Sequence, residues 1–439
     1  MAITKVTGAL LGNYTGGSAD DTVVIGDGAG DAITTGADNT FIGDNAGSAT
    51  TTASNNVAVG SSALLVNTTG ASNVAVGYLA LTANTTAGAN VAISHNALLA
   101  NTTGAQNVSI GYNSMYTNTT GANNVALGTS ALYTNNADNN TAVGTSALGA
   151  NTTGSENTAM GSSALAANTT GNYNIAIGDE AGASLVSGTE NTFMGFLSGR
   201  YTGSADHPDY NTGVGSRSLY ANTTGEKSVA LGAYALAGQT TGGNNTGIGY
   251  AAGDVITTGS TNICIGSITD PSANNASAQF VIGYNVTGIA NDTVTIGNGS
   301  NKASLGLDGS DTSWAATSDI RLKDNVEDSL AGLDFINELR PITYKWKAKK
   351  DVPSDMPEYD DGSDEPCKGT GKTNHGFVAQ EVKAVIDKYD SVKDGHNIWQ
   401  EEDSGTQTLA PSALMPMMVK AVQELSAEVE ELKKQLENK

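Results

Sequence analysis

Short apolar runs recur along most of the chain at a fixed spacing, and each run ends in a glycine. These glycines stand at positions 26, 43, 60, 77, 111, 128, 144, 161, 178, 195, 215, 232, 249, 266, 283 and 297, with Ser94 in the one remaining place. Thirteen of the sixteen intervals are seventeen residues, and Ile, Val, Leu or Met always precedes the glycine position. Asn stands four residues before it in thirteen repeats. A sustained period of this kind predicts a solenoid in which each repeat forms one coil.

Each repeat combines a strand pattern with turn residues. In Val57-Ala58-Val59-Gly60 the valines lie on one face of a short strand and Ala58 on the other. The Asn-Thr-Thr-Gly segments that follow are typical of turns. Seventeen residues suffice for two short strands and two turns, and coils would stack by backbone pairing about 4.8 Å apart. Because both strand faces are apolar, we expect association of several chains to bury the alanine face, most simply in a homotrimer.

The repeat resembles the heads of trimeric autotransporter adhesins. The Val-Ala-Val-Gly and Ala-Leu positions carry the resemblance over residues 22–299. It implies a left-handed parallel β-roll in a trimer. The predicted fold class is therefore mainly β, a trimeric parallel β-solenoid shaft, followed by a small α+β domain that ends in a coiled-coil helix.

Charge density divides the chain in two. Residues 1–317 hold 5 Lys and Arg and 19 Asp and Glu, whereas residues 318–439 hold 16 and 25. We expect an attachment segment at 1–21, the shaft at 22–299, a distal tip and linker at 300–317, and a separate domain at 318–439. The net charge of −23 disfavours nucleic acid as a partner. No apolar run is long enough to insert into a membrane, and the two cysteines have no metal-ligand neighbours, so neither metal nor cofactor is expected.

The charged C-terminal part has the patterns of a small globular domain. Leu330, Leu333, Ile336 and Leu339 predict a helix that ends before Pro341. Alternation over 342–346 predicts a strand, and 375–382 predicts a strand leading into a helix. From about residue 412 the chain predicts a parallel coiled coil, with its seam at Met418, Val422, Leu425, Val429, Leu432 and Leu436.

Four motifs in this part, in order, resemble the endosialidase-type intramolecular chaperone domain of phage tail fibres and tailspikes. They are Ser318-Asp-Ile-Arg-Leu-Lys323, Arg340-Pro-Ile-Thr-Tyr-Lys-Trp346, Gly376-Phe-Val-Ala-Gln-Glu-Val382, and Leu409-Ala-Pro411 before a Lys420-Ala-Val-Gln-Glu-Leu425 helix. The resemblance implies that the domain helps a trimeric β-fibre to fold and then releases itself. It makes Ser318 the nucleophile, Lys323 the base and Thr317–Ser318 the cleaved bond, with Asp319 and Arg321 in supporting roles.

A Ser–Lys dyad is chemically reasonable here, because a serine hydroxyl attacks a carbonyl only when a base takes its proton. On a helix, residues five apart lie about 140° from each other. Ser318 and Lys323 would therefore meet across a turn or between neighbouring chains. Attack on the Thr317 carbonyl would give an ester or a tetrahedral intermediate. The serine peptidase activity would act only on its own chain.

These observations favour a phage tail fibre, located in the virion tail and assembled in the host cytoplasm. Its partners would be other phage tail or baseplate proteins and a host cell-surface receptor, either a glycan or an outer-membrane protein. The twenty-residue interval before Gly215 is a candidate receptor loop, with Tyr201, Asp206, His207, Asp209 and Tyr210, or else a plain solvated loop. One alternative function is a tailspike enzyme acting on host polysaccharide, which would need paired carboxylates in a cleft. The other is a bacterial trimeric adhesin.

Overall fold

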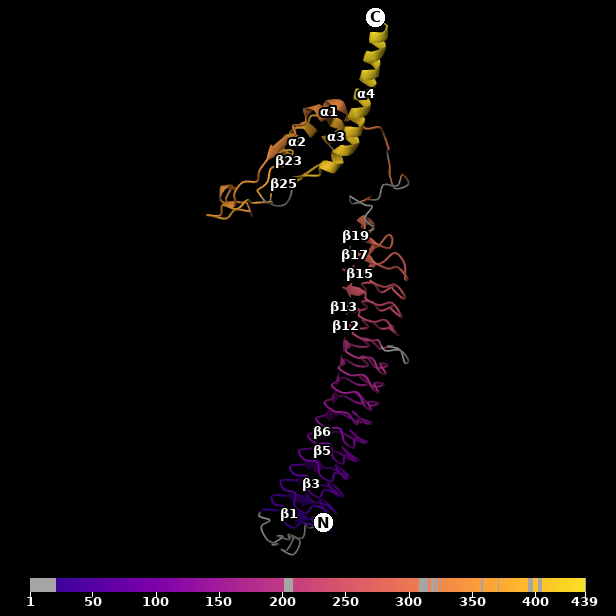
Figure 1. Cartoon of the computed structure of the whole chain (residues 1–439), viewed down its shortest axis with the longest axis vertical. Coiled ribbons are helices and arrows are strands. Elements are labelled where there is room, and N and C mark those ends of the chain that lie inside the picture. The colour runs from indigo at the N-terminus through magenta and orange to yellow at the C-terminus, as the bar shows by residue number, and fades with distance from the viewer. Residues whose placement is uncertain are drawn as a thin grey trace, which may run out of the picture. The chain divides into compact units, whose positions relative to one another are not determined.

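The chain forms two compact units, 1–317 and 318–439, in a computed structural model. The structure describes residues 21–200, 208–307, 315–316, 320, 323–324, 326–356, 358–369, 371–393, 398–401 and 405–438. The first unit is built from short strands that stack along a solenoid (Figure 1). The second is a small α+β unit that ends in a long helix.

The solenoid has about 16 turns, and almost every coil contributes one three-residue strand to a continuous sheet. These strands are β1 (Val23–Ile25), β2 (Thr40–Ile42), β3 (Val57–Val59), β4 (Val74–Val76), β5 (Val91–Ile93), β6 (Val108–Ile110), β7 (Val125–Leu127), β8 (Thr141–Val143), β9 (Thr158–Met160), β10 (Ile175–Ile177), β11 (Thr192–Met194), β12 (Thr212–Val214), β13 (Val229–Leu231), β14 (Thr246–Ile248), β15 (Ile263–Ile265), β17 (Gln279–Tyr284) and β19 (Thr293–Asn298).

Neighbouring strands pair in parallel and in the register of the repeat. Val57, Ala58 and Val59 of β3 lie beside their counterparts in β4, and the same alignment holds from β1 to β19. The sheet ends in antiparallel pairings of β19 with β20 (Asn301–Gly306) and of β20 with β21 (Ala315–Ala316). The predicted fold class, a mainly β solenoid followed by a small domain with a terminal helix, is confirmed.

The prediction of two strands in every coil was wrong for most of the solenoid. After the glycine the chain runs through successive turns, with positive φ at the second and fourth residues, as in Ser62 (57°) and Leu64 (56°). This backbone is too curved to form a second sheet. A second ladder appears only near the end, where β16 (Thr269–Asp270) pairs with β18 (Val286–Thr287).

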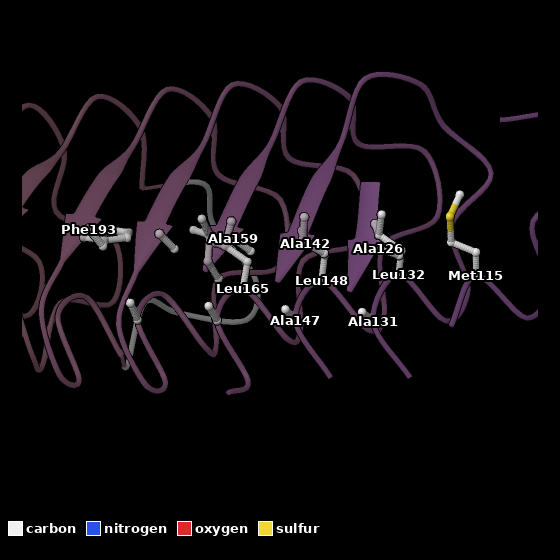
Figure 2. Packing of buried hydrophobic residues seen from close by; sticks show 14 of the residues in the cluster. Met115, Ala126, Ala131, Leu132, Ala142, Ala147, Leu148, Ala159, Leu165 and Phe193 are labelled. Atoms are coloured by element: carbon white, nitrogen blue, oxygen red, sulfur yellow. The ribbon is translucent and has the colours of Figure 1, made fainter. Parts of the chain in front are cut away.

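The alanine face of each strand points into its own coil, and the prediction that association between chains would bury it was wrong. Ala58 is fully buried, whereas Val57 and Val59 are half-exposed on the outside. The coil interior is thin, so it accepts a small residue from the strand and a leucine from the turn. Figure 2 shows this repeated pairing, for example Ala142 with Leu148.

Two coils place a phenylalanine inside instead of alanine, and both lose leucines in exchange. Phe41 and Phe193 are fully buried. A Cβ added to Gly47 would lie 2.7 Å from the Phe41 ring, and one added to Gly199 would lie 2.5 Å from the Phe193 ring. Other coils carry leucine at these glycine positions, so the interior volume is approximately conserved.

Asparagine side chains form two buried ladders along the solenoid. In the first, the backbone N–H of Asn56 donates to Asn39 Oδ1 at 3.0 Å, and the pattern repeats from coil to coil. In the second, Asn84 Nδ2 donates to Asn67 Oδ1 at 2.8 Å. These ladders satisfy polar groups that the thin interior would otherwise leave unpaired. They explain why Asn recurs with the period.

The second unit contains four helices and two short antiparallel ribbons among its described residues (Figure 1). The helices are α1 (Leu333–Glu338), α2 (Ala379–Ile386), α3 (Asp390–Lys393) and α4 (Met415–Glu437), with 3-10 turns at Lys349–Asp351 and Pro411–Leu414. The ribbons pair β22 (Ile342–Tyr344) with β23 (Asn374–Gly376), and β24 (Trp399–Glu401) with β25 (Gln407–Leu409).

Candidate functional site

Most of the predicted cleavage segment lies outside the described residues, namely Thr317, Ser318, Asp319 and Arg321. Lys323 is described and exposed, and its backbone N–H donates to the carbonyl of Ile320 at 3.1 Å. The Ser–Lys dyad therefore stays a prediction.

Two other predicted motifs of the second unit are brought together by an ion pair. Arg340 Nε donates to Glu381 Oε2 at 2.9 Å, and Arg340 Nη2 donates to the other carboxylate oxygen. This pairing lowers the pKa of the Glu381 carboxyl. Glu381 lies in the first turn of α2, where a negative charge also favours the helix. The pair connects the start of the 342–346 strand to the 376–382 motif, a contact that sequence analysis did not foresee.

The strand and helix expected from these motifs are present. β22 pairs with β23 so that Ile342 faces Gly376 and Tyr344 faces Asn374. The Tyr344 and Trp346 rings meet edge to face, with centroids 5.3 Å apart. The expected helix around 330–339 is shorter than predicted, since α1 begins only at Leu333 and Leu330 is exposed.

The last motif, in α4, contacts the N-terminal end of α1. Glu424 of α4 accepts a hydrogen bond from the backbone N–H of Leu333 at 2.7 Å. A Cβ on Gly332 would lie 2.2 Å from the same carboxylate oxygen, so the glycine leaves room for Glu424. α1 and α4 are thereby joined, and Phe335 is buried in the core of the unit with Ile386.

A groove of about 750 Å³ lies between the two ribbons of this unit. Tyr344, Trp346, Met356, Phe377 and Leu409 supply apolar surface to it. His375 lines the same groove and is exposed on β23.

The predicted coiled-coil seam of α4 is exposed. Within this unit Ala421 and Leu414 face the core, whereas the seam residues remain between 41% and 73% exposed. These residues are Met418, Val422, Leu425, Val429, Leu432 and Leu436. One face of α4 therefore packs against its own unit, whereas a second, apolar face is exposed to solvent in the single chain.

A second uncovered apolar surface runs along the solenoid. We call it the outward strip, formed by the first and third residues of the strands. Its exposed members include Val125, Leu127, Met160, Ile175, Met194, Val229, Leu231 and Ile265. Parallel sheets are normally covered on both faces, so an apolar strip of this length is typical of an interaction surface.

The comparison with family models gives a match within the second unit. Residues 318–390 match the family described as chaperone of endosialidase. The match covers the first three motifs of the chaperone unit (residues 318–439) and ends before Leu409. The comparisons with curated proteins and with solved structures gave no match. The chain thus combines an endosialidase-chaperone segment with a β-solenoid.

The candidate receptor loop is described only in part. Tyr201, Asp206 and His207 lie outside the described residues. Asp209 Oδ1 accepts a hydrogen bond from the backbone N–H of Thr189 at 2.7 Å, and Tyr210 is 49% exposed with φ of 61°. Asp209 therefore helps to join two coils, and the receptor role of this loop stays a prediction.

Neither a metal cluster nor a membrane-spanning helix is found in the described part of the chain. There, no three His, Cys, Asp or Glu side chains are grouped to hold a metal ion. No described helix is long and apolar enough to cross a membrane. Cys264 and Cys367 are both free thiols, and burial raises the pKa of Cys264 to about 12.

Proposed function

We propose that this protein is a bacteriophage tail fibre: a homotrimeric shaft that attaches to the host surface and is folded by its C-terminal chaperone unit. The observation that carries this proposal is the endosialidase-chaperone match at 318–390, directly after a solenoid of about 16 turns. The virion tail is the corresponding location, with assembly in the host cytoplasm.

The homotrimer is supported by two apolar surfaces that a single chain leaves open. The outward strip follows the shaft from coil to coil, and the seam of α4 repeats over the length of the helix. Both are continuous along their elements, as expected for parallel association of identical chains. Three outward strips facing one another would cover the open face of each parallel sheet.

Self-cleavage at Thr317–Ser318 is supported by three coincident boundaries. The charge density changes there, the two compact units divide there, and the family match begins at Ser318. In the proposed reaction Lys323 accepts the hydroxyl proton of Ser318, and Oγ bonds to the carbonyl carbon of Thr317. The C–N bond then breaks and the Ser318 nitrogen takes the proton, after which water hydrolyses the resulting ester. Asp319 and Arg321 would position this turn.

A denaturing gel tests the cleavage. Wild type should give two fragments, whereas Ser318→Ala should remain full-length. Lys323→Arg should also remain full-length, because arginine keeps the charge but does not lose its proton. Ser329→Ala is the matched control and should be cleaved normally. A single full-length band in every sample refutes the peptidase role and leaves the chaperone role standing.

The chaperone and trimer roles have their own test. Light scattering of Ser318→Ala should give the mass of three chains. A chain that ends at Thr317 should form aggregates or monomers when expressed alone. A soluble, protease-resistant trimer formed without residues 318–439 would contradict the chaperone role. A monomeric full-length chain would contradict the fibre.

The remaining partners follow from the arrangement of a fibre. Residues 1–21 would join other tail or baseplate proteins. The loop with Tyr201, Asp206, His207, Asp209 and Tyr210, together with the 300–317 tip, would contact a glycan or an outer-membrane protein. Deleting residues 201–207 should lower binding to host cells while the trimer persists. Unchanged binding would show that this loop connects two coils and does not contact the receptor.

A further inference from the structure

Four side chains form a contiguous cluster on the coils that carry β12, β13 and β14. The Arg217 guanidinium carbon lies 5.9 Å from the ring centre of Tyr220 and 5.6 Å from that of Tyr234. Arg217 Nη1 donates a hydrogen bond to Tyr234 Oη at 3.0 Å. The Tyr234 ring meets the Tyr250 ring edge to face, with centroids 5.9 Å apart. We call these four residues the Arg217 cluster.

The cation in this cluster has no acidic partner in the part of the chain that the structure describes. No described carboxylate lies within ion-pair distance of Arg217, although acids outnumber bases in the shaft. Glu180, which holds the equivalent repeat position two coils earlier, is paired with Arg200 instead. The Nε of Arg217 is buried without a partner. The hydrogen bond to Tyr234 Oη and the contacts with the Tyr220 and Tyr234 rings hold the guanidinium in place. An immobilised guanidinium without a counter-charge favours binding of a carboxylate.

The aromatic members give the cluster an apolar surface next to this charge. Tyr250 is 55% exposed, and Tyr220 and Tyr234 are half-exposed. At the position of Tyr250, most other coils carry a small or polar residue, including Ser61, Thr129 and Ser162. Tyrosine combines an apolar ring with a hydrogen-bonding hydroxyl, which suits ligands that have both kinds of surface. A sugar ring has apolar C–H faces and polar edges.

We propose that the Arg217 cluster binds a saccharide that carries a carboxylate. The guanidinium pairs with the carboxylate, and the exposed tyrosine rings pack against the sugar. Three coils cover roughly 10 Å along the shaft, enough for a short oligosaccharide. This inference deepens the proposed attachment function and rests on it for its biological setting.

A second aromatic row on the shaft provides the comparison. The rings of Tyr78, His95 and Tyr112 contact one another edge to face on successive coils, at 5.1 and 5.4 Å. Tyr78 and Tyr112 are as exposed as Tyr250, but no described arginine or lysine lies over their rings. The sequence separates this row from the Arg217 cluster by several coils. It therefore offers a matched control for binding by tyrosine alone.

The test measures binding of oligogalacturonate to the full trimer by ligand-observed NMR. Its fully methyl-esterified form is the paired probe, because esterification removes the charge and keeps the sugar. Wild type should bind the acid form and lose roughly tenfold or more affinity for the ester. Arg217→Ala should show the same loss with the acid form. Tyr250→Ala, at an exposed ring, should weaken binding with the fold intact, and Tyr112→Ala should leave binding unchanged.

Each other result overturns the inference. Equal binding of acid and ester refutes the role of the carboxylate, and unchanged affinity in Arg217→Ala refutes the site. Absence of binding to a trimer of correct mass refutes the ligand class. Because light scattering on the same samples reports the trimer separately, failure of this inference is distinguishable from failure of the fibre assignment.

Discussion

Exchanging one interior phenylalanine for leucine tests whether the shaft is held together by conserved interior volume. Phe193 is fully buried, and truncation of such a residue to alanine costs about 3–5 kcal/mol per chain. Gly199→Leu alone should also destabilise, because its Cβ would lie 2.5 Å from the Phe193 ring. The two changes together should restore the alanine–leucine pair of other coils. The double variant should therefore be more stable than either single variant.

The backbone at Gly199 already has the shape that leucine adopts elsewhere in the shaft. Its φ is 60°, and Leu165 at the equivalent position has a φ of 50°. The added strain should be about 1–2 kcal/mol, which is less than the cavity it fills. Adding Gly182→Leu should recover more stability, because that glycine contacts the other side of the Phe193 ring.

Chemical denaturation followed by circular dichroism measures the coupling between the two positions. We expect a favourable coupling energy of about 3 kcal/mol or more per chain between Phe193→Ala and Gly199→Leu. Phe193→Ala combined with Gly47→Leu is the control, because the second change lies in a distant coil and should add independently. Additivity within about 0.5 kcal/mol for the Phe193 and Gly199 pair would refute the argument from conserved volume.

Three further predictions address charge, the chaperone unit and the shaft surface. Burial and the neighbouring Asp254 carboxylate raise the pKa of Asp270 to about 6, so its contribution to stability is full below about pH 4 and is lost as pH rises through about 6. In Asp270→Asn the free energy of unfolding should fall less over this pH range, by about 1–2 kcal/mol after allowing for partial exposure. Thermal unfolding at a series of pH values measures this difference, and a pH profile equal to that of wild type would contradict the assignment. Gly332→Ala should displace Glu424 from α1 and lower the stability of the chaperone unit by about 1–2 kcal/mol. Hydrogen exchange at the Leu333 amide should then be faster, and unaltered protection of this amide would contradict the prediction. Leu231→Glu should weaken or abolish the trimer, which light scattering would report as a loss of mass. If Leu231 is instead a plain surface residue, the mass should not change and the stability should change by less than about 0.5 kcal/mol.

The sequence was sufficient to predict the coil but not which side of the strand faces inward. In Val57-Ala58-Val59 both faces of the strand are apolar. The alternation of side chains along a strand shows which residues share a face, but it does not show which face points inward. The answer depends on volume, because a coil with one short strand has room for Ala58 and Leu64 but not for the valines as well. The sequence also gave no sign that leucines such as Leu64 adopt a positive φ, because leucine normally has a negative φ.

In the chaperone unit, local patterns predicted local elements and missed the contacts between them. The strand at 342–344 and the 374–386 strand–helix follow from alternation and spacing. The Arg340–Glu381 pair and the Glu424–Leu333 hydrogen bond join residues that are 41 and 91 positions apart. Opposite charges in separate motifs were the only available signal for the first. The start of α1 at Leu333 depends on the second.

In the proposed homotrimer, the two uncovered apolar surfaces would have different roles in setting the alignment of the three chains. Along the outward strip nearly every coil offers similar aliphatic residues, so shifting one chain by a coil exchanges like for like and costs little. Two features that distinguish individual coils, Phe41 and Phe193, are buried inside their own chain and do not contact a neighbouring chain. A helical seam that occurs once per chain can supply this alignment, and the exposed seam of α4 is such a surface within the described residues. We infer that the chaperone unit acts by fixing register before the shaft closes, so a variant with charged residues at Leu425 and Leu432 should yield staggered trimers with ragged ends in electron microscopy. Shafts of uniform length from that variant would show that register is encoded in the solenoid itself.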